Sequence, residues 1–323
     1  MTTVATEVLE RAVALACRAP SYHNSQPWLW VADRDGLHLH LDPSRVVETD
    51  LTKRQALISC GVALDHLRVA MAAAGWKADI DRCPDANNLD HLASISFTET
   101  TAVTDEQRRR AEAITMRHTD RLPFGPVTDW TDFETALRRR IDDSAALVDV
   151  ISDADRQELA QATDLTDALR LYDSNYFATL QRWTAPFEAS EGISYDSLVS
   201  SAEGDRVDVG RTFPVSHHPE RRAQVPVDLS TILVISAHAD TRRDLLGCGE
   251  TLSTVLLEAT VAGLATCTLT HLTELSTSRH LVEEVTGRPL AQVLVRVGRA
   301  PDNEQSPPPT PRRPLADVLT INL

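Results

Sequence analysis

The chain has 323 residues, of which 42% are hydrophobic and 24% charged, a composition typical of a folded globular protein with one large or two medium domains. Its formal charge of −15 argues against nucleic acid or an anionic membrane as a partner, because both attract a concentrated positive field. Five cysteines without a C-x-x-C spacing give neither a disulfide framework nor a zinc signature, and no run of about 18 uncharged apolar residues is present. The N-terminus carries Glu7, Glu10 and Arg11 and lacks the core of a signal peptide. We therefore expect a cytoplasmic protein that does not enter a membrane.

The first hundred residues predict a helix, a hairpin and a buried central helix. Residues 4–18 place their apolar side chains on one helical face, and Pro20 ends that helix. Residues 28–31 and 37–41, joined by an Asp-Gly turn, have the pattern of a β-hairpin. Thr52 and Gln55 have the spacing of a capping box for a helix that runs to about residue 74. This helix is apolar nearly all round, as helices at the centre of a fold are, and residues 92–97 predict a strand beyond it.

The middle of the chain predicts further helices and one long segment without periodicity. We expect a helix over residues 131–141, a strand over 146–151, and a long helix that Ser152 and Asp155 cap. That long helix is expected to carry the apolar residues Leu159, Leu165, Leu169, Tyr172 and Leu180. Residues 183–225 show little periodicity, which in a compact domain is typical of a lid or a disordered segment. Residues 301–314 contain three consecutive prolines and predict an extended arm.

The last third of the chain repeats the plan of the first. Strands are predicted at 231–236 and 292–297, and Thr241-x-x-Asp244 opens a second apolar helix between them. Cys60–Gly61 and Cys248–Gly249 occupy the same place in the two helices, each glycine 14 residues before the helix-ending glycine. This spacing predicts an internal duplication, although two apolar helices can also share it by coincidence.

Three short stretches carry polar groups that suit ligand binding. Residues 19–28 read APSYHNSQPW, residues 117–121 read RHTDR, and residues 311–315 read PRRPL. Arg117 and Arg121 with the Thr119 hydroxyl between them suit a phosphate, because guanidinium groups bind it by charge-assisted hydrogen bonds. Taken singly, the three stretches also fit a helix–strand connector, a salt-bridge patch with Asp120 or Glu112, and a solvated tail.

In combination, these stretches resemble motifs of the flavin-dependent nitroreductases. Residues 19–28 are similar to that family's APSxxNxQPW loop, residues 116–124 to its opening basic motif, and Arg312–Arg313 to its C-terminal basic pair. The asymmetric motifs and the insert at about 183–225 are most similar to the dormancy-associated Acg-type proteins of actinobacteria. The resemblance implies an α+β fold, with a mixed, mainly antiparallel sheet and flanking helices. It also implies that one chain mimics the usual homodimer, with residues 1–105 as the first half and 106–323 as the second, so that a monomer suffices.

The resemblance also implies one FMN site between the two halves. The second half would hold FMN through the basic motif, the segment after the central helix and the C-terminal pair: Arg117, His118, Thr119, Arg121, Leu269, Thr270, His271, Arg312 and Arg313. The first half would contribute the loop residues Pro20, Ser21, Tyr22 and Asn24. The first half has no opening basic motif and the second has no APSxxN loop, so the parts suffice for one flavin site rather than two.

The resemblance implies an oxidoreductase in which FMN accepts hydride from NAD(P)H and reduces nitro compounds or quinones. An alternative is a flavin-holding protein with little turnover, whose insert covers the flavin with the aromatic residues Trp183, Phe187, Tyr195 and Phe213. A third interpretation is a regulatory protein that binds no flavin. No side chain is expected to act as a catalytic acid or base, because the cofactor carries the chemistry.

Other reactive residue types are expected to be structural. His38 and His40 share a strand face, but no third ligand is evident, which favours a solvated hairpin over a metal site. Cys267, near the expected flavin edge, is interpreted as a packing residue. His217–His218 are expected to lie in a loop.

Overall fold

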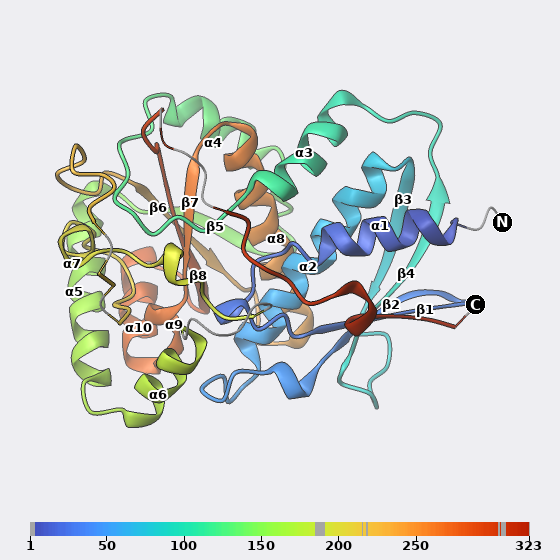
Figure 1. Cartoon of the computed structure of the whole chain (residues 1–323), viewed down its shortest axis with the longest axis horizontal. Coiled ribbons are helices and arrows are strands. Elements are labelled where there is room, and N and C mark those ends of the chain that lie inside the picture. Colours follow the sequence, from blue (N-terminus) through green and yellow to red (C-terminus); the bar gives the residue numbers. More distant parts are fainter. Residues whose placement is uncertain are drawn as a thin grey trace.

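The computed structural model describes residues 4–184, 191–214, 216–217, 219–302, 304 and 308–322. Two β-sheets lie at opposite ends of the molecule, and two long helices, α2 (Arg54–Ala73) and α8 (Arg242–Val261), cross between them (Figure 1). One cluster of buried apolar side chains includes residues of both sheets and both helices, so the two ends share a continuous core.

The first sheet has the strand order β3-β4-β2-β1-β9. Its strands are β1 (Trp28–Asp33), β2 (Gly36–Leu41), β3 (Trp76–Arg82), β4 (His91–Glu99) and β9 (Leu319–Ile321). All pairs are antiparallel except β1 with β9, which brings the C-terminus back to the first half of the chain. The predicted hairpin is confirmed as β1–β2, and the predicted strand at 92–97 is the centre of β4.

The second sheet has the strand order β5-β6-β8-β7, and every pair is antiparallel. Its strands are β5 (Leu147–Val150), β6 (Thr231–Ser236), β7 (Ala265–Leu269) and β8 (Ala291–Gly298). The sequence analysis predicted β5, β6 and β8. It missed β3 and β7, which begin within two residues of the helix-ending glycines Gly75 and Gly263, and it also missed the three-residue β9 of the first sheet.

The two sheets repeat the same topology and the same register. The Trp30–Leu39 pair of β1 and β2 corresponds to the Val148–Ile235 pair of β5 and β6. The Leu37–Ile95 pair of β2 and β4 corresponds to Leu233–Val295 of β6 and β8, and the Ala78–Phe97 pair of β3 and β4 to Thr266–Val297 of β7 and β8. The central pair of each sheet also has a register shift at the same place, at Leu39/His40 and at Ile235/Ser236. Coincidence does not reproduce three registers and a shift, so the predicted duplication is confirmed.

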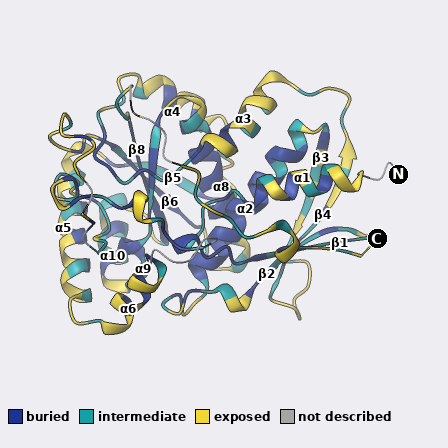
Figure 2. Ribbon diagram, viewed as in Figure 1, coloured by how far each residue is buried: buried dark blue, intermediate teal, exposed yellow. Residues whose placement is uncertain are grey.

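The central helices approach each other at the glycines that revealed the repeat. A Cβ atom on Gly61 would overlap the Leu246 carbonyl oxygen and lie 3.0 Å from the Cα of Gly249, and a Cβ on Gly249 would overlap the Ile58 carbonyl oxygen. The helices can therefore pack backbone to backbone only because both positions lack a side chain. By length and composition α2 could cross a membrane, but 83% of that apolar window is buried inside the molecule, as in the core helix of a soluble protein (Figure 2).

The start of α2 differs from the prediction. Thr52 does not cap the helix, because Lys53 is the N-cap residue and adopts a left-handed conformation with φ of 58°. The carboxylate of Asp50 instead accepts hydrogen bonds from the backbone N–H groups of Gln55 and Ala56, at 3.2 and 2.9 Å. In α8 the predicted cap is confirmed, since Thr241 accepts a hydrogen bond from the backbone of Asp244.

The remaining helices cover the outer faces of this framework. They are α1 (Thr6–Ala16), α3 (Asp105–Met116), α4 (Trp130–Arg138), α5 (Asp153–Arg170), α6 (Ser174–Trp183), α7 (Ser201–Gly204), α9 (His271–Glu274) and α10 (Ser276–Thr286). The prediction of one long helix after Ser152 is wrong, because the chain turns between α5 and α6. Of the residues expected to form its apolar face, Leu165 and Leu169 are exposed on α5 and Tyr172 is exposed at the turn.

Two segments without long regular elements lie outside the sheets. Residues 191–214 run from the end of α6 back across the second sheet (Figure 1). The C-terminal arm, described from 308, has no regular structure until residue 315, as predicted, and passes α1 on its way to β9. Both segments border the space between the two halves.

Candidate functional site

Two adjoining cavities lie between the halves of the chain. The large cavity has a volume of about 290 Å³ and the small cavity about 70 Å³. The two cavities share six lining residues: Pro20, Ser21, His23, Thr119, Arg121 and Ile193. They therefore form one continuous site, with walls from the loop before β1, the segment after α3, and residues 191–214.

The small cavity is lined by guanidinium groups without a carboxylate partner. Arg117, Arg121 and Arg312 reach it, and none of them forms an ion pair with any carboxylate in the described part of the chain. The Nε of Arg117 is buried and has no hydrogen-bond partner among the described residues. Burial and the charge of Arg18 lower the pKa of Arg117 to about 10, and burial with Arg117 and Arg18 lowers the pKa of Arg312 to about 9. This concentration of buried positive charge suits an anion.

The alternative of a salt-bridge patch between these arginines and Asp120 is wrong. Asp120 is instead paired with Arg222, whose Nη2 lies 2.5 Å from Oδ2 of the carboxylate, and Arg222 is 2% exposed. The other carboxylate oxygen accepts a hydrogen bond from the backbone N–H of Leu122 at 3.0 Å. Because Arg222 neutralises Asp120, the charges of Arg117 and Arg121 remain available to a ligand.

The basic motif is extended, and this decides which of its side chains reach the site. The backbone N–H of Asp120 donates to the Thr266 carbonyl at the start of β7, at 2.9 Å. In an extended segment alternate side chains point the same way, so Arg117, Thr119 and Arg121 all line the cavities. His118 points away, lines neither cavity, and has its Nδ1 3.4 Å from the Met116 carbonyl. Its expected role at the flavin does not agree with this position.

The loop before β1 has an unusual backbone that internal hydrogen bonds hold. His23, Asn24 and Gln26 have φ angles of 51°, 58° and 52°, in the left-handed region that favours glycine. The Oγ of Ser21 accepts from the backbone of Gln26 at 2.9 Å, and the backbone of Tyr22 donates to Ser59 of α2 at 3.1 Å. Strained backbone of this kind persists mainly at functional sites, and the polar residues Ser21 and Asn24 line the small cavity.

The C-terminal arm closes one side of the small cavity. Arg312 donates hydrogen bonds to the carbonyls of Cys17, Arg18 and Ala19, at 3.0, 3.0 and 3.2 Å. These carbonyls follow the end of α1, where partial negative charge attracts a cation. Arg313 does not line either cavity, because its Nη1 lies 3.4 Å from the Asp42 carboxylate and 3.3 Å from the Gln26 carbonyl. We therefore correct its predicted role, since it fixes the arm rather than facing the ligand.

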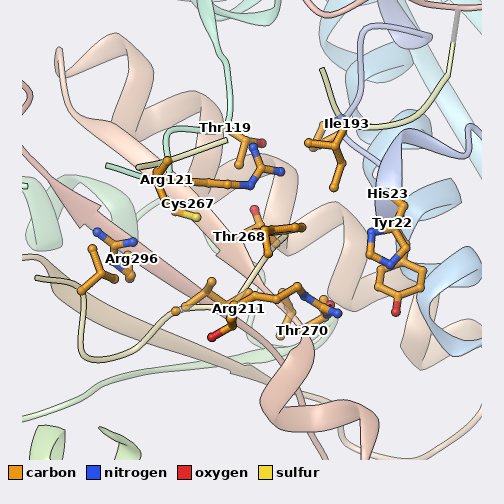
Figure 3. Close-up of a pocket in the computed structure, with 18 of the residues that line it drawn as sticks. Tyr22, His23, Thr119, Arg121, Ile193, Arg211, Cys267, Thr268, Thr270 and Arg296 are labelled. Atoms are coloured by element: carbon orange, nitrogen blue, oxygen red, sulfur yellow. The ribbon is translucent and has the colours of Figure 1, made fainter. Parts of the chain in front are cut away.

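The wall of the large cavity includes residues of the central helix and of the second sheet. The central helix α2 contributes Gln55, Ile58, Ser59 and Val62, and the end of β7 contributes the stretch from Cys267 to Thr270 (Figure 3). The Nε2 of Gln55 is buried there without a partner in the described structure. Cys267 is 2% exposed, belongs to a core cluster and has a raised pKa because it is buried, so the packing role predicted for it agrees with its position.

Of the three residues predicted after the second central helix, Leu269 and Thr270 line the large cavity and His271 does not. His271 is the first residue of α9 and is 2% exposed, and neither ring nitrogen has a partner in the described structure. Burial and the nearby charge of Arg211 lower its pKa to about 3. The short helix turns the side chain away from the strand end, so only the residues before it face the site.

Arg211 and Glu274 were missed by the sequence analysis. Arg211 lies in the insert, lines the large cavity and forms a buried ion pair with Glu274 of α9. Its Nη2 also lies 3.1 Å from the Thr270 hydroxyl (Figure 3). No pattern in residues 183–225 marks this arginine, because its partners are 59 and 63 residues away in the chain.

The aromatic residues expected in the lid behave differently from one another. Phe213 lines the large cavity and lies under Arg121, with 5.0 Å between the guanidinium carbon and the ring centroid. The Trp183 ring lies nearly parallel to His23, with 6.4 Å between centroids. Tyr195 lines neither cavity, and Phe187 lies outside the described residues. The backbone of His217 donates to the Tyr195 hydroxyl, and His218 is outside the described residues.

The hairpin histidines have a neighbour that the sequence analysis missed. His91 of β4 lies between them, with its Nε2 3.2 Å from Nδ1 of His38 and its ring stacked on His40 at 4.6 Å. Within the described residues, no group of three His, Cys, Asp or Glu side chains has the arrangement of a metal site. The cluster lies on the first sheet and lines neither of the two cavities.

Comparisons with known proteins place the chain in a family. A scan against protein-family models gives no match. The chain is 53% identical over 322 residues to the Mycobacterium tuberculosis protein named "Putative NAD(P)H nitroreductase acg", covering 99% of this chain and 97% of that protein. It is 34% identical to "Putative NAD(P)H nitroreductase Rv3131" of the same organism, covering 97% and 91% of the two chains.

Among solved structures, the FMN-dependent nitroreductase NfnB of Mycobacterium smegmatis in complex with NADPH aligns with a TM-score of 0.40 and 16% identity. That alignment covers 66% of this chain and 97% of NfnB. The family assignment rests on the sequence relatives, which match along nearly the whole chain. The protein belongs to the Acg-type family of NAD(P)H nitroreductases.

Proposed function

We propose that the protein is a cytoplasmic FMN-dependent oxidoreductase that uses NAD(P)H to reduce nitro compounds or quinones, and that it acts as a monomer. The observation that carries this proposal is a continuous site with two different ends. One end has unpaired buried guanidinium groups, and the other is a larger cavity with few charges. FMN has the matching pair of ends, a phosphate and a flat ring system. The names of the relatives support NAD(P)H as the electron donor, and the five unpaired cysteines support a reducing compartment.

FMN would supply acceptors for buried polar atoms that have no hydrogen-bond partner among the described residues. Arg117, Thr119, Arg121 and Arg312 would hold the phosphate, which offers acceptors to the unpartnered Nε of Arg117. In the large cavity, the unpartnered Nε2 of Gln55 is a donor that the ring's carbonyl and nitrogen atoms could satisfy. A buried polar atom without a partner costs about 1–3 kcal/mol, so a ligand that satisfies several of them gains affinity.

The protein's own contribution would be position and electrostatics. FMN, when bound, supplies hydride transfer. Leu269 and Thr270 would present their backbone at the edge of the ring, and Pro20 to Tyr22 would cover it from the other half of the chain. Fixed dipoles stabilise developing negative charge better than mobile water, because they need no reorganisation. His23 and His271 have pKa values lowered to about 3, first by burial and next by Arg211, and therefore remain neutral at physiological pH.

The visible spectrum of the purified protein tests the proposal. We expect flavin absorption bands that bleach when NADPH or NADH is added without oxygen, and a screen of nitro and quinone acceptors would then identify which restore the bands. A colourless protein that cannot be reconstituted with FMN would contradict the proposed cofactor.

A flavin-holding protein is a second candidate, and one observation favours it. Residues 191–214 supply Ile193, Val199, Val207, Gly210 and Phe213 to the wall of the large cavity, which is where a substrate would need to enter. Yellow protein that resists both nicotinamide nucleotides but is bleached by dithionite would favour this role over catalysis.

A further inference from the structure

One guanidinium group of the insert joins the walls of the large cavity. Arg211 is buried, with a side chain 6% exposed. It pairs with the carboxylate of Glu274 in α9, and its Nη2 lies 3.1 Å from the hydroxyl of Thr270 at the end of β7. Its Nη1 lies 3.1 Å from the hydroxyl of Tyr176 in α6. A single side chain thus fastens residues 191–214, here called the lid segment, to three other elements of the second half.

The same group also faces the first half of the chain. The guanidinium carbon of Arg211 lies 5.7 Å from the ring centroid of Tyr22, in the loop that precedes β1. A cation at this distance is attracted by the face of an aromatic ring. Tyr22 and Thr270 both line the large cavity (Figure 3). Arg211 therefore links the lid segment to the two sides of the site that would enclose a flavin ring.

The ion pair is strong enough to matter for the position of the lid segment. Burial alone would raise the pKa of Glu274, but the charge of Arg211, its hydrogen bond and the nearby His23 and His271 together outweigh burial and lower this pKa to about 2. The carboxylate therefore stays ionised at physiological pH, and the pair stays charged in a buried place. Glu274 also lies 3.7 Å from Nη2 of Arg170 in α5, so separating the pair leaves the buried guanidinium of Arg211 without a carboxylate, which is unfavourable unless water enters.

The size of the cavity makes this fastening relevant to function. Its volume of about 290 Å³ is at the lower end of the roughly 300–1,000 Å³ of ligand pockets. A flavin ring would fill most of this space. A nicotinamide or an aromatic acceptor stacked on the ring would need further room, and the lid segment is the wall that has no counterpart in the first half.

We propose that Arg211 is a latch that holds the lid segment over the large cavity and so determines which solutes react with the bound flavin. With the latch closed, only small solutes reach the ring, and nicotinamide reacts after the ion pair with Glu274 has opened. Arg211 is a positioning residue in this account, since it acts through the lid segment. The inference rests on the proposed FMN site for its catalytic consequence, but the latch itself is a property of the polypeptide.

Arg211→Gln opens the latch, and three further variants make the test specific. Arg211→Gln with Glu274→Gln removes both charges, so it separates loss of the latch from the effect of leaving Glu274 with only the more distant Arg170. Arg211→Lys keeps the charge but loses the planar fork that reaches Thr270 and Tyr176 together. Arg182→Gln is the matched control, because Arg182 lies on α6 in an exposed pair with Glu48.

The first readout is the reactivity of the flavin in the FMN-loaded proteins. We expect Arg211→Gln and the double variant to increase acrylamide quenching of flavin fluorescence and to speed anaerobic reduction by NADPH about tenfold or more, because one charge-assisted interaction is lost. Arg211→Lys should fall between these variants and the control. The latch is overturned if variants that hold the same amount of FMN show unchanged quenching and unchanged or slower reduction.

The second readout does not require flavin. Backbone hydrogen exchange over residues 191–214 is compared between the wild type and the double variant, with and without FMN. We expect faster exchange in the variant and unchanged exchange in α2. If the wild type binds no FMN, the proposed cofactor fails while this measurement still decides the latch, and equal exchange in the two proteins would refute it.

Discussion

Three arginines line the small cavity and a fourth, Arg18, adds its charge nearby, and these charges explain much about the site. Arg18, Arg117, Arg121 and Arg312 form no ion pair with the carboxylates of the described residues, and burial lowers the pKa of each. A lowered pKa means that the folded chain is destabilised by these charges at neutral pH, in the case of Arg117 at every pH below about 10. A phosphate dianion would relieve the repulsion. The residues that bind the ligand are therefore expected to weaken the ligand-free fold.

Arg117→Gln tests this relation between binding and stability. Arg117 donates no hydrogen bond to the described residues through its buried Nε, so the variant loses charge repulsion and little else. We expect FMN to bind about 10 to 100-fold more weakly, the effect of losing one charged hydrogen bond, while the melting temperature of the FMN-free protein stays the same or rises. Flavin fluorescence titration and thermal denaturation measure the two quantities.

Arg108→Gln is the control for this comparison. Arg108 lies on α3, the helix that precedes Arg117, and forms an exposed pair with Asp105. It should change neither quantity by much, since exposed pairs contribute about 0–1 kcal/mol. Unchanged FMN affinity in Arg117→Gln would show that the small cavity does not bind the phosphate.

At the scale of elements, the contact between α2 and α8 holds the two halves at the spacing the site requires. Both helices line the large cavity, α2 through Gln55 to Val62 and α8 through Leu252. Their closest approach is at Gly61 and Gly249, where the backbones touch. A change at this crossing would therefore affect stability and the shape of the cavity together.

Gly61→Ala is expected to destabilise the protein by about 1–3 kcal/mol or more, because its Cβ would overlap the Leu246 carbonyl and backbone cannot move aside as a side chain can. Urea denaturation measures the change. Gly204→Ala is the control, since a Cβ there would meet only the Val199 side chain at 3.7 Å. Equal stability of the two variants would mean that the helices separate without cost.

The sequence predicted elements with a strong local pattern and missed those without one. The two central helices, the hairpin and β6 have clear periodicity, and the repeated glycines identified the duplication. The helices α9 and α10, which follow β7, were not predicted, and the break between α5 and α6 was hidden by apolar residues that proved exposed. Tertiary contacts decide these positions, and local propensity does not record them.

The same division applies to the site. Ten of the thirteen predicted residues line one of the two cavities, since each belongs to a motif whose geometry is local: Pro20, Ser21, Tyr22, Asn24, Arg117, Thr119, Arg121, Leu269, Thr270 and Arg312. His118, His271 and Arg313 line neither, because strand alternation, a helix start and the Asp42 pair direct them elsewhere. Arg211 and Arg222 were unpredictable, because long-range ion pairs give them their roles.

At the scale of the whole molecule, the duplication raises the question of a second site. The register of the repeat places Arg82, the last residue of β3, where the other half has Thr270, and Glu250 of α8 where α2 has Val62. In place of a cavity, these two side chains form a two-bond ion pair, with Nε and Nη2 of Arg82 each 2.6 Å from a Glu250 oxygen. Thr270 and Val62 line the large cavity. The Arg82–Glu250 ion pair takes their place in the other half, so it fills the position equivalent to the large cavity.

We therefore expect one FMN per chain. Flavin absorbance after denaturation gives the FMN concentration, and amino-acid analysis gives the protein concentration. Their ratio is the number of FMN molecules per chain. Native mass spectrometry provides an independent count. A ratio of two would contradict the closed second position, and saturation with excess FMN before gel filtration excludes partial occupancy as the reason for a ratio of one.

The covalent connection of the two halves has a consequence for how the site responds to dilution. In a homodimer with an interfacial cofactor, dissociation of subunits empties the site, so occupancy falls as the protein becomes scarce. Here both walls of the cavities belong to one polypeptide, and their encounter is intramolecular, at an effective concentration that dilution cannot change. A few copies in a cell would form the site as completely as many, and no exchange with a related subunit could mix their walls.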